Sequence, residues 1–348
     1  MVFCTFYLYT LDRFNIRYNI LSLLPCFTIY FLVSAMQYNV GTDYFTYINI
    51  YNHQFLYERY YDVNEFVFYY TVKLSNFLDL PEQSLFFFFS LLQSIPIFIY
   101  LSVMRNKYKL NVFILFFIYM TVTGIYINQL NGIRQYAALT LFPLISFLCF
   151  ERRYLLSLIL ILFSISLHQS AFIFIVVFPL VYFYRKTNIP LFFIFLITCP
   201  IYIFGTELIL YLVKILELKY TSYFDSEYSE PKDILNLLTR LYYLPLLLYF
   251  FYIYKRNGDR NYFDFSIFLF CIFYFSFIMG LDFGLLSRIA SYFWFFIVFP
   301  LYYIINDSIK KGQSFSFIVF VIYVLVPFLL KTTIFAKAEY LYQSILFT

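Results

Sequence analysis

The chain has 348 residues, of which 63% are hydrophobic and 12% are charged, and its formal net charge is +5. Soluble domains carry about 25% charged residues, so this composition excludes an ordinary soluble enzyme. The positive charges form no long basic run, which argues against a nucleic-acid partner. The composition therefore predicts an integral membrane protein that is surrounded by membrane lipids.

Apolar windows recur along the chain, each about as long as a helix that crosses ~30 Å of hydrocarbon. They cover residues 20–36, 112–127, 155–167, 191–204, 241–254, 263–279, 289–305 and 315–330. Transmembrane strands would alternate apolar and polar residues, and these windows do not. Because lipid offers the backbone no hydrogen-bond partners, the windows predict helices. With no internal repeat and no soluble segment, we expect one all-α polytopic membrane domain over residues 1–348.

Lys and Arg cluster in short segments between the windows, and cytoplasmic loops are enriched in these residues. The clusters are Arg13/Arg17, Arg105/Lys107/Lys109, Arg152/Arg153, Arg185/Lys186, Lys255/Arg256/Arg260 and Lys310/Lys311. Placing them all in the cytoplasm predicts roughly 10–12 spans and puts loops 38–83 and 207–236, with the C-terminal tail, on the opposite face. Segment 64–80 then cannot be a complete span, so we expect an interfacial or re-entrant helix there.

Cysteine and histidine spacing predicts no metal site. The five cysteines lie singly in or beside apolar stretches, at Cys4, Cys26, Cys149, Cys199 and Cys271. We expect small core residues rather than disulfides or metal ligands. The two histidines, His53 and His168, belong to no carboxylate or thiolate cluster. We therefore expect neither a metal nor any other cofactor.

Unusual polar residues gather at helix ends opposite the basic clusters, in four short motifs. In the first, residues 39–44, Gly41 permits a tight turn, and Thr42 or Asp43 can cap the following helix. Alternatively, Asp43 binds a sugar hydroxyl or removes its proton, while nearby tyrosines such as Tyr44 offer stacking surfaces. The sequence leaves both roles open.

The second motif, residues 128–135, opens a predicted helix on which Asn131, Arg134 and Gln135 share one face. An arginine at a helix N-terminus works against the helix dipole, so we expect it to have an anionic partner. A guanidinium group binds phosphate oxygens in a bidentate manner, and free N–H groups at the helix start add donors for the same anion. The alternative is an arginine that snorkels to the membrane interface.

The last two motifs lie at further outer helix ends. His168 ends an apolar helix, where its imidazole can act as a general base, bind an oxyanion, or simply cap the helix. Asp282 and Arg288 supply either a second phosphate-binding arginine with an orienting carboxylate or a local ion pair of small energetic value. Together the four motifs predict a site that faces away from the cytoplasm.

In order and spacing, these motifs resemble the EpsG-like branch of bacterial polysaccharide polymerases, which includes many Wzy-type O-antigen polymerases. The matching stretches are Val-Gly-Thr-Asp-Tyr at 40–44, Asn-Gly-Ile-Arg-Gln at 131–135, His-Gln-Ser at 168–170 and Ser-Arg-Ile-Ala-Ser-Tyr-Phe at 287–293. The resemblance implies a multi-pass protein of the bacterial inner membrane, with a fold similar to GT-C glycosyltransferases and a periplasmic active site.

The implied reaction moves a growing glycan from undecaprenyl pyrophosphate to the non-reducing end of a new undecaprenyl-pyrophosphate-linked repeat unit. A separate co-polymerase partner would set the chain length. We expect Arg134 and Arg288 to hold the pyrophosphate without a metal ion. Asp43 or His168 is expected to act as the base, and Glu65 is a lesser candidate. The other expected substrate contacts come from Gly41, Tyr44, Asn131, Gln135 and Asp282.

Two other functions remain open. Another polyprenyl-linked glycosyltransferase or ligase would share the donor and the outer loops, so only its product distinguishes it. A flippase or transporter of lipid-linked oligosaccharide would show inverted repeats and charged residues at the bilayer midplane. The positions of the polar residues at outer helix ends favour the polymerase over the transporter.

Overall fold

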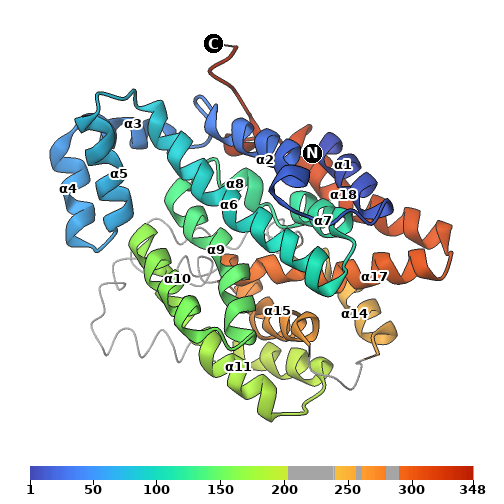
Figure 1. The fold of residues 1–348 in the computed structure, drawn as a ribbon. Coiled ribbons are helices and arrows are strands. Elements are labelled where there is room, and N and C mark those ends of the chain that lie inside the picture. The colour runs from blue at the N-terminus through green and yellow to red at the C-terminus, as the bar shows by residue number, and fades with distance from the viewer. Residues whose placement is uncertain (203–237, 239, 256–260, 280–289, 348) are drawn as a thin grey trace. The chain divides into compact units, whose positions relative to one another are not determined.

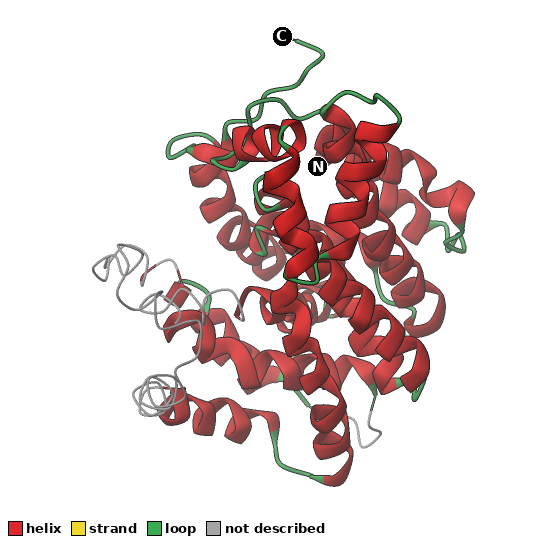
Figure 2. Ribbon diagram, turned by 90° about the vertical axis from the view of Figure 1, so that its left-hand side faces the viewer, coloured by secondary structure: helices red, strands yellow, loops and turns green. Residues whose placement is uncertain are grey.

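The computed structural model describes the chain in two compact units. It describes all residues except 203–237, 239, 256–260, 280–289 and 348. One unit comprises Met1–Ile175 with Ile305–Thr348, and the other comprises Val176–Ile304. The described secondary structure is helical throughout apart from turns and an isolated bridge (Figure 2), which confirms the all-α fold. The single membrane domain over residues 1–348 stays a prediction.

Four described helices are long and apolar enough to cross a membrane. They are α6 (Gln83–Tyr108), α9 (Ile133–Phe150), Ala290–Lys310, whose last part is α17 (Val298–Lys310), and α18 (Ser314–Thr332). The shorter apolar helices are α2 (Ile20–Ala35), α7 (Val112–Val122), α10 (Tyr154–Leu167), Leu191–Tyr202, α14 (Leu244–Ile253) and α15 (Tyr262–Met279). These helices confirm a polytopic membrane protein.

The described part of the second unit is rich in aromatic contacts. Helix α11 (Val177–Lys186) ends in the predicted basic pair and packs against α15, as does the short helix η3 (Phe295–Ile297). The ring of Phe195 lies 5.1 Å from Phe251 and 5.3 Å from Tyr274 between centroids. The predicted outer loop 207–236 lies outside the described residues.

The first unit is a bundle built around α6. Helix α6 packs against α2 and α9, and α9 packs in turn against α10. The N-terminal helix α1 (Val2–Arg13) packs against α2 and α7, and α18 also packs against α7 (Figure 1). Apolar helices of one bundle bury their contact faces together and expose the remaining faces. Only 6% of the apolar window of α18 is buried, so this helix offers most of its surface to lipid.

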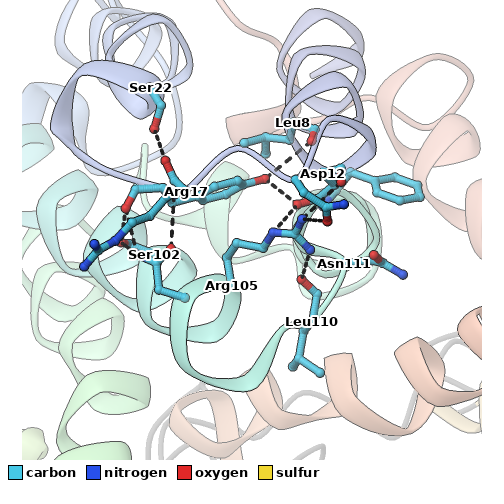
Figure 3. Close-up of polar contacts among 12 residues, drawn as sticks. Leu8, Asp12, Arg17, Ser22, Ser102, Arg105, Leu110 and Asn111 are labelled. Carbon is cyan, nitrogen blue, oxygen red and sulfur yellow. Dashed lines mark hydrogen bonds and ion pairs between the residues drawn. The ribbon is translucent and has the colours of Figure 1, made fainter.

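In the first unit, the helix ends that carry the basic clusters meet at one end, which we call the basic end. The Nε atom of Arg105 lies 3.2 Å from Oδ1 of Asp12, and its Nη2 donates to Oδ1 of Asn15 at 3.0 Å. The Tyr18 hydroxyl donates to Oδ1 of Asp12 at 2.9 Å, so the buried carboxylate, which Figure 3 shows beside Arg105, is well satisfied. These bonds join the turn after α1 to the end of α6.

Further contacts bring the other clusters of this unit to the basic end. Lys107 pairs with Glu151, which follows α9. The side-chain amide of Asn111 donates to Oδ1 of Asn306 at 2.9 Å, beside the end of α17. The clusters at 13–17, 105–109, 152–153 and 310–311 therefore lie together, as the topology prediction requires.

The opposite end of α6, about 39 Å away for a helix of 26 residues, gathers the first three polar motifs, and we call it the site end. The side-chain amide of Gln83 donates to the carbonyl of Ala35 at 2.6 Å, which joins the start of α6 to the end of α2. The N–H of Tyr38 donates to the carbonyl of Gln343 at 3.0 Å. The C-terminal tail thus lies at the site end, as expected.

Residues 38–83 fold into three short helices at the site end. They are α3 (Tyr44–Asn52), α4 (Gln54–Asp62) and α5 (Phe66–Phe77). Helix α5 packs against α4, α6 and α10 (Figure 1). With 12 residues it is about 18 Å long, too short to cross ~30 Å of hydrocarbon. This agrees with the expectation that segment 64–80 is not a complete span.

All five cysteines are free thiols, as expected. Cys4 and Cys26 are buried core residues that lie close together, because the packing of α1 on α2 places the Cys26 sulfur 3.6 Å from the Cys4 carbonyl oxygen. Sequence spacing could not show this contact, since 22 residues separate the two positions.

Candidate functional site

Arg134 lies in the first turn of α9 and forms an ion pair with Glu65, which precedes α5. The side chains are 17% and 6% exposed, so the pair is largely removed from water. The first turn of α9 contains no acidic residue of its own. Glu65 therefore supplies, in this structure, the anionic partner that the position of Arg134 predicts. From the sequence we expected a substrate phosphate in this place.

Three aromatic rings surround the guanidinium of Arg134, one from each short helix of segment 38–83. Its central carbon lies 4.4 Å from the ring centroid of Tyr60, 4.8 Å from Phe68 and 5.8 Å from Tyr47. We call these three rings the arginine cage. All three are buried, and cation–π attraction strengthens as water is excluded. The cage therefore fixes the position of the guanidinium.

The cage leaves part of the guanidinium without a protein partner. The Nε atom of Arg134 is buried and has no hydrogen-bond partner within the described part of the chain. Burial raises the pKa of Tyr47 in the cage, although the adjacent positive charge opposes that rise. The Tyr47 hydroxyl consequently stays neutral and remains able to donate a hydrogen bond to an anion near Arg134.

Glu65 links the arginine to the end of α10. Its Oε1 atom accepts the backbone N–H of Gln169 at 3.2 Å. The preceding residue, His168, ends α10 as predicted, and its Nδ1 accepts the backbone N–H of Ser170 at 3.2 Å. Because a backbone N–H can only donate, a neutral His168 carries its proton on Nε2. The Ser170 hydroxyl also lies 2.8 Å from Nδ1, so Ser170 engages the basic nitrogen of that tautomer.

The Gly41 motif is joined to the second motif by Asn131. The Oδ1 atom of Asn131 accepts the backbone N–H of Asp43 at 2.8 Å. Gly41 has a φ of +78°, and a Cβ at this position would lie 2.8 Å from Cγ of Asn131. Both the left-handed backbone and the close approach therefore require glycine. The predicted tight turn is present.

The capping alternative for Asp43 is not realised. Asp43 occupies the position before α3, but its side chain forms no capping hydrogen bond. Its carboxylate is half-buried, and the nearby Thr42 hydroxyl donates to it over 3.4 Å, a long contact. The carboxylate is thus left with acceptor capacity for another hydroxyl group.

The remaining predicted residues lie in different surroundings. The Tyr44 ring is 4% exposed and stacks on Phe86 at 4.8 Å between centroids, so its faces are covered in this conformation. Asn131 precedes α9, which begins at Ile133, so the expected helix face shared by Asn131, Arg134 and Gln135 is wrong for Asn131. The reason is a turn through Gly132 before the helix starts. Asp282 and Arg288 lie outside the described residues.

A buried polar layer beneath the site was not predicted. The side-chain amide of Gln93, on α6, donates to the carbonyl of Ile133 at 2.9 Å and to that of Gln129 at 3.4 Å. The Tyr30 hydroxyl donates to Oε1 of Gln129 at 3.0 Å. These bonds hold the turn that carries Asn131 and Arg134. Gln93 inside a long apolar helix was the available sequence signal, because intramembrane polar residues are costly unless paired.

The site therefore joins four segments that are distant in the chain: 41–44, 65, 131–135 and 168–170. It offers a caged guanidinium, a half-buried carboxylate and an imidazole donor. Among the described residues, no group of three or more His, Cys, Asp or Glu side chains could hold a metal ion. The arrangement suits recognition of an anion together with proton transfer from a hydroxyl group.

Comparison with known proteins identifies the family. The sequence model of the EpsG family matches residues 19–344, so the chain belongs to this family. No curated protein and no solved structure gives a significant match. This match confirms the predicted resemblance to the EpsG family and makes the chain a membrane protein of polysaccharide biosynthesis.

Proposed function

We propose that this EpsG-family protein polymerises undecaprenyl-pyrophosphate-linked oligosaccharide repeat units of a surface polysaccharide. The growing glycan is transferred to the non-reducing end of a new lipid-linked unit at the periplasmic face of the bacterial inner membrane. The observation that carries the proposal is the caged Arg134, buried where the first three polar motifs meet. A separate co-polymerase would set the length of the product.

The orientation follows from the charge of the two ends. The basic end carries the clusters at 13–17, 105–109, 152–153 and 310–311, and short basic segments remain in the cytoplasm. The site end then faces the periplasm. Cysteine labelling tests this orientation: Asn52→Cys and Lys109→Cys, both at exposed positions, should react with a membrane-impermeant thiol reagent from opposite sides. Labelling of both from one side would contradict it.

In the proposed mechanism, Arg134 binds the pyrophosphate of the donor and stabilises the charge that this leaving group gains. The bond between the anomeric carbon and the pyrophosphate oxygen breaks as the acceptor hydroxyl oxygen bonds to that carbon. A preorganised cation costs no reorganisation at this step, and removing one such group lowers kcat by roughly 10²–10³-fold. Arg288 is proposed as the second guanidinium, so the transfer needs no metal ion.

Asp43 is proposed to receive the proton of the acceptor hydroxyl. Its half-buried carboxylate has free acceptor capacity and is fixed beside Asn131 through its backbone N–H. His168 carries its proton on Nε2 when neutral, which suits a hydrogen bond to a phosphate oxygen better than proton removal. We accordingly favour Asp43 over His168 as the base.

A polysaccharide ladder on a gel tests the function. Cells that lack their own copy of the gene are complemented with wild type or with Arg134→Ala, Arg288→Ala, Asp43→Asn or His168→Ala, at matched membrane abundance. Deletion should leave a single repeat unit, wild type should restore the ladder, and these variants should not. Arg13→Ala, at an exposed position at the end of α1, is the control and should restore it.

Two outcomes would refute the polymerase. Loss of even the single-repeat band on deletion would indicate export or an earlier transfer. A full ladder that is no longer attached to its final lipid would indicate a ligase.

A further inference from the structure

The Glu65–Arg134 pair occupies the position in which the proposed reaction needs an anion. The two residues are 69 positions apart and meet only because α3, α4 and α5 fold against the start of α9. Glu65 binds through Nη1 of the guanidinium. A carboxylate at this position and a substrate phosphate therefore compete for the same cation.

The guanidinium has more donors than Glu65 satisfies. Arginine presents five N–H groups in a planar fork, and Nε of Arg134 is buried without a partner among the described residues. An unpaired buried donor is costly, and a phosphate group can bind such a fork in a bidentate manner. The unpaired Nε is an observation independent of the ion pair, and it indicates a ligand with more acceptor oxygens than Glu65 offers.

The two oxygens of Glu65 have different partners, so replacing the carboxylate by a phosphate group at Arg134 need not break both of its hydrogen bonds. Oε2 contacts Arg134, whereas Oε1 accepts the N–H of Gln169 at 3.2 Å. A rotation that removes Oε2 from Arg134 can retain the second bond. The cage, by contrast, holds the guanidinium from three sides, so the carboxylate is the movable partner.

We propose that Glu65 is an internal competitor: it occupies the anion subsite of Arg134 in the resting protein and is displaced when a diphosphate group binds. This inference rests on the proposed function for the identity of the anion but not for the exchange itself. Weak monovalent anions cannot displace a buried, hydrogen-bonded carboxylate, whereas a diphosphate satisfies Nη and Nε together. Glu65 thus restricts the subsite to diphosphate-bearing ligands and keeps the buried cation paired between turnovers.

Titration with inorganic pyrophosphate tests the exchange on the full chain in lipid nanodiscs, with calorimetry as the readout. If the pair is closed in 90–99% of molecules, the apparent Kd exceeds the intrinsic Kd by roughly 10- to 100-fold. Glu65→Gln should lower the Kd by that factor. Glu58→Gln, an exposed carboxylate on α4, is the matched control and should leave the Kd unchanged, while Arg134→Ala should abolish binding.

A second variant guards against misfolding of Glu65→Gln. Glu65→Asp keeps the charge but withdraws the carboxylate by one methylene, so it should lower the Kd by an intermediate factor. Folding of each variant is checked by its thermal unfolding. An unchanged or higher Kd in both folded variants would overturn the proposal and leave Glu65 a purely structural partner. If wild type restores the ladder but Glu65→Gln leaves the Kd unchanged, the exchange alone is refuted. If Glu65→Gln lowers the Kd but wild type restores no ladder, the polymerase alone is refuted.

Discussion

Replacing Gly41 with alanine tests the junction between Asp43 and Asn131. The backbone of Gly41 has a φ of +78°, which costs an L-residue about 1–2 kcal/mol. The new Cβ would also lie 2.8 Å from Cγ of Asn131, and such overpacking typically costs about 1–3 kcal/mol. The total is roughly 2–5 kcal/mol, and relief of the clash should break the Asn131 bond to the Asp43 N–H.

Gly312 provides a matched control in the same unit. Its φ is +66°, and nothing lies within 4 Å of the corresponding Cβ, so Gly312→Ala carries the backbone cost alone. In thermal unfolding, Gly41→Ala should lower Tm by about 2–12 °C more than Gly312→Ala. It should also shorten the polysaccharide ladder, which the control should not.

A double variant locates the clash. In an Asn131→Gly background the whole crowding side chain is removed, including the Cβ that would lie 2.8 Å from the new methyl group, so Gly41→Ala should then cost no more than the control substitution. Equal Tm losses for Gly41→Ala and Gly312→Ala in the parent chain would refute the steric reasoning.

Two further predictions concern opposite ends of the first unit. Arg134→Lys keeps the charge but loses the planar fork and its stacking, so it should reduce the initial rate of polymerisation by roughly 10²–10³-fold. Arg13→Lys, at an exposed position at the end of α1, should leave the rate unchanged. At the basic end, burial raises the pKa of Glu151, but hydrogen bonds from Lys107 and Tyr108 lower it by more, so the net pKa lies below the ordinary value of 4.5. A carboxyl group whose pKa is lowered in the folded state stabilises the fold at pH values above its pKa in the unfolded state. This stabilisation is lost as the pH falls through the pKa of the folded state, so below about pH 4.5 the Tm of wild type should fall by more than the Tm of Glu151→Gln.

Apolar windows and charge clusters were sufficient to predict most of the bundle. The helices found at 20–35, 154–167 and 314–332 follow from composition, because only a helix satisfies the backbone in lipid. The basic clusters predicted which helix ends share a face, and the contacts of Arg105 and Lys107 in the first unit agree.

The partner of Arg134 could not be predicted from local patterns. Its charge at a helix start indicated an anion, but Glu65 lies 69 positions away, and pairing depends on how three short helices fold. The arginine cage could not be predicted from the sequence for another reason. With 39 Tyr and 51 Phe residues in the chain, no single ring stands out by composition, and only the packing distinguishes Tyr60 from the rest.

The exposed surface of α18 has a practical consequence for handling the protein. Large apolar side chains such as Phe315, Ile318 and Ile322 are more than half exposed, and the helix packs mainly against α7 in its unit. A detergent micelle must therefore cover nearly the whole circumference of the helix. Short-chain detergents pack poorly around such a surface, so extraction directly into lipid-containing polymer discs should preserve the position of α18 and, through α7, the bundle beside it.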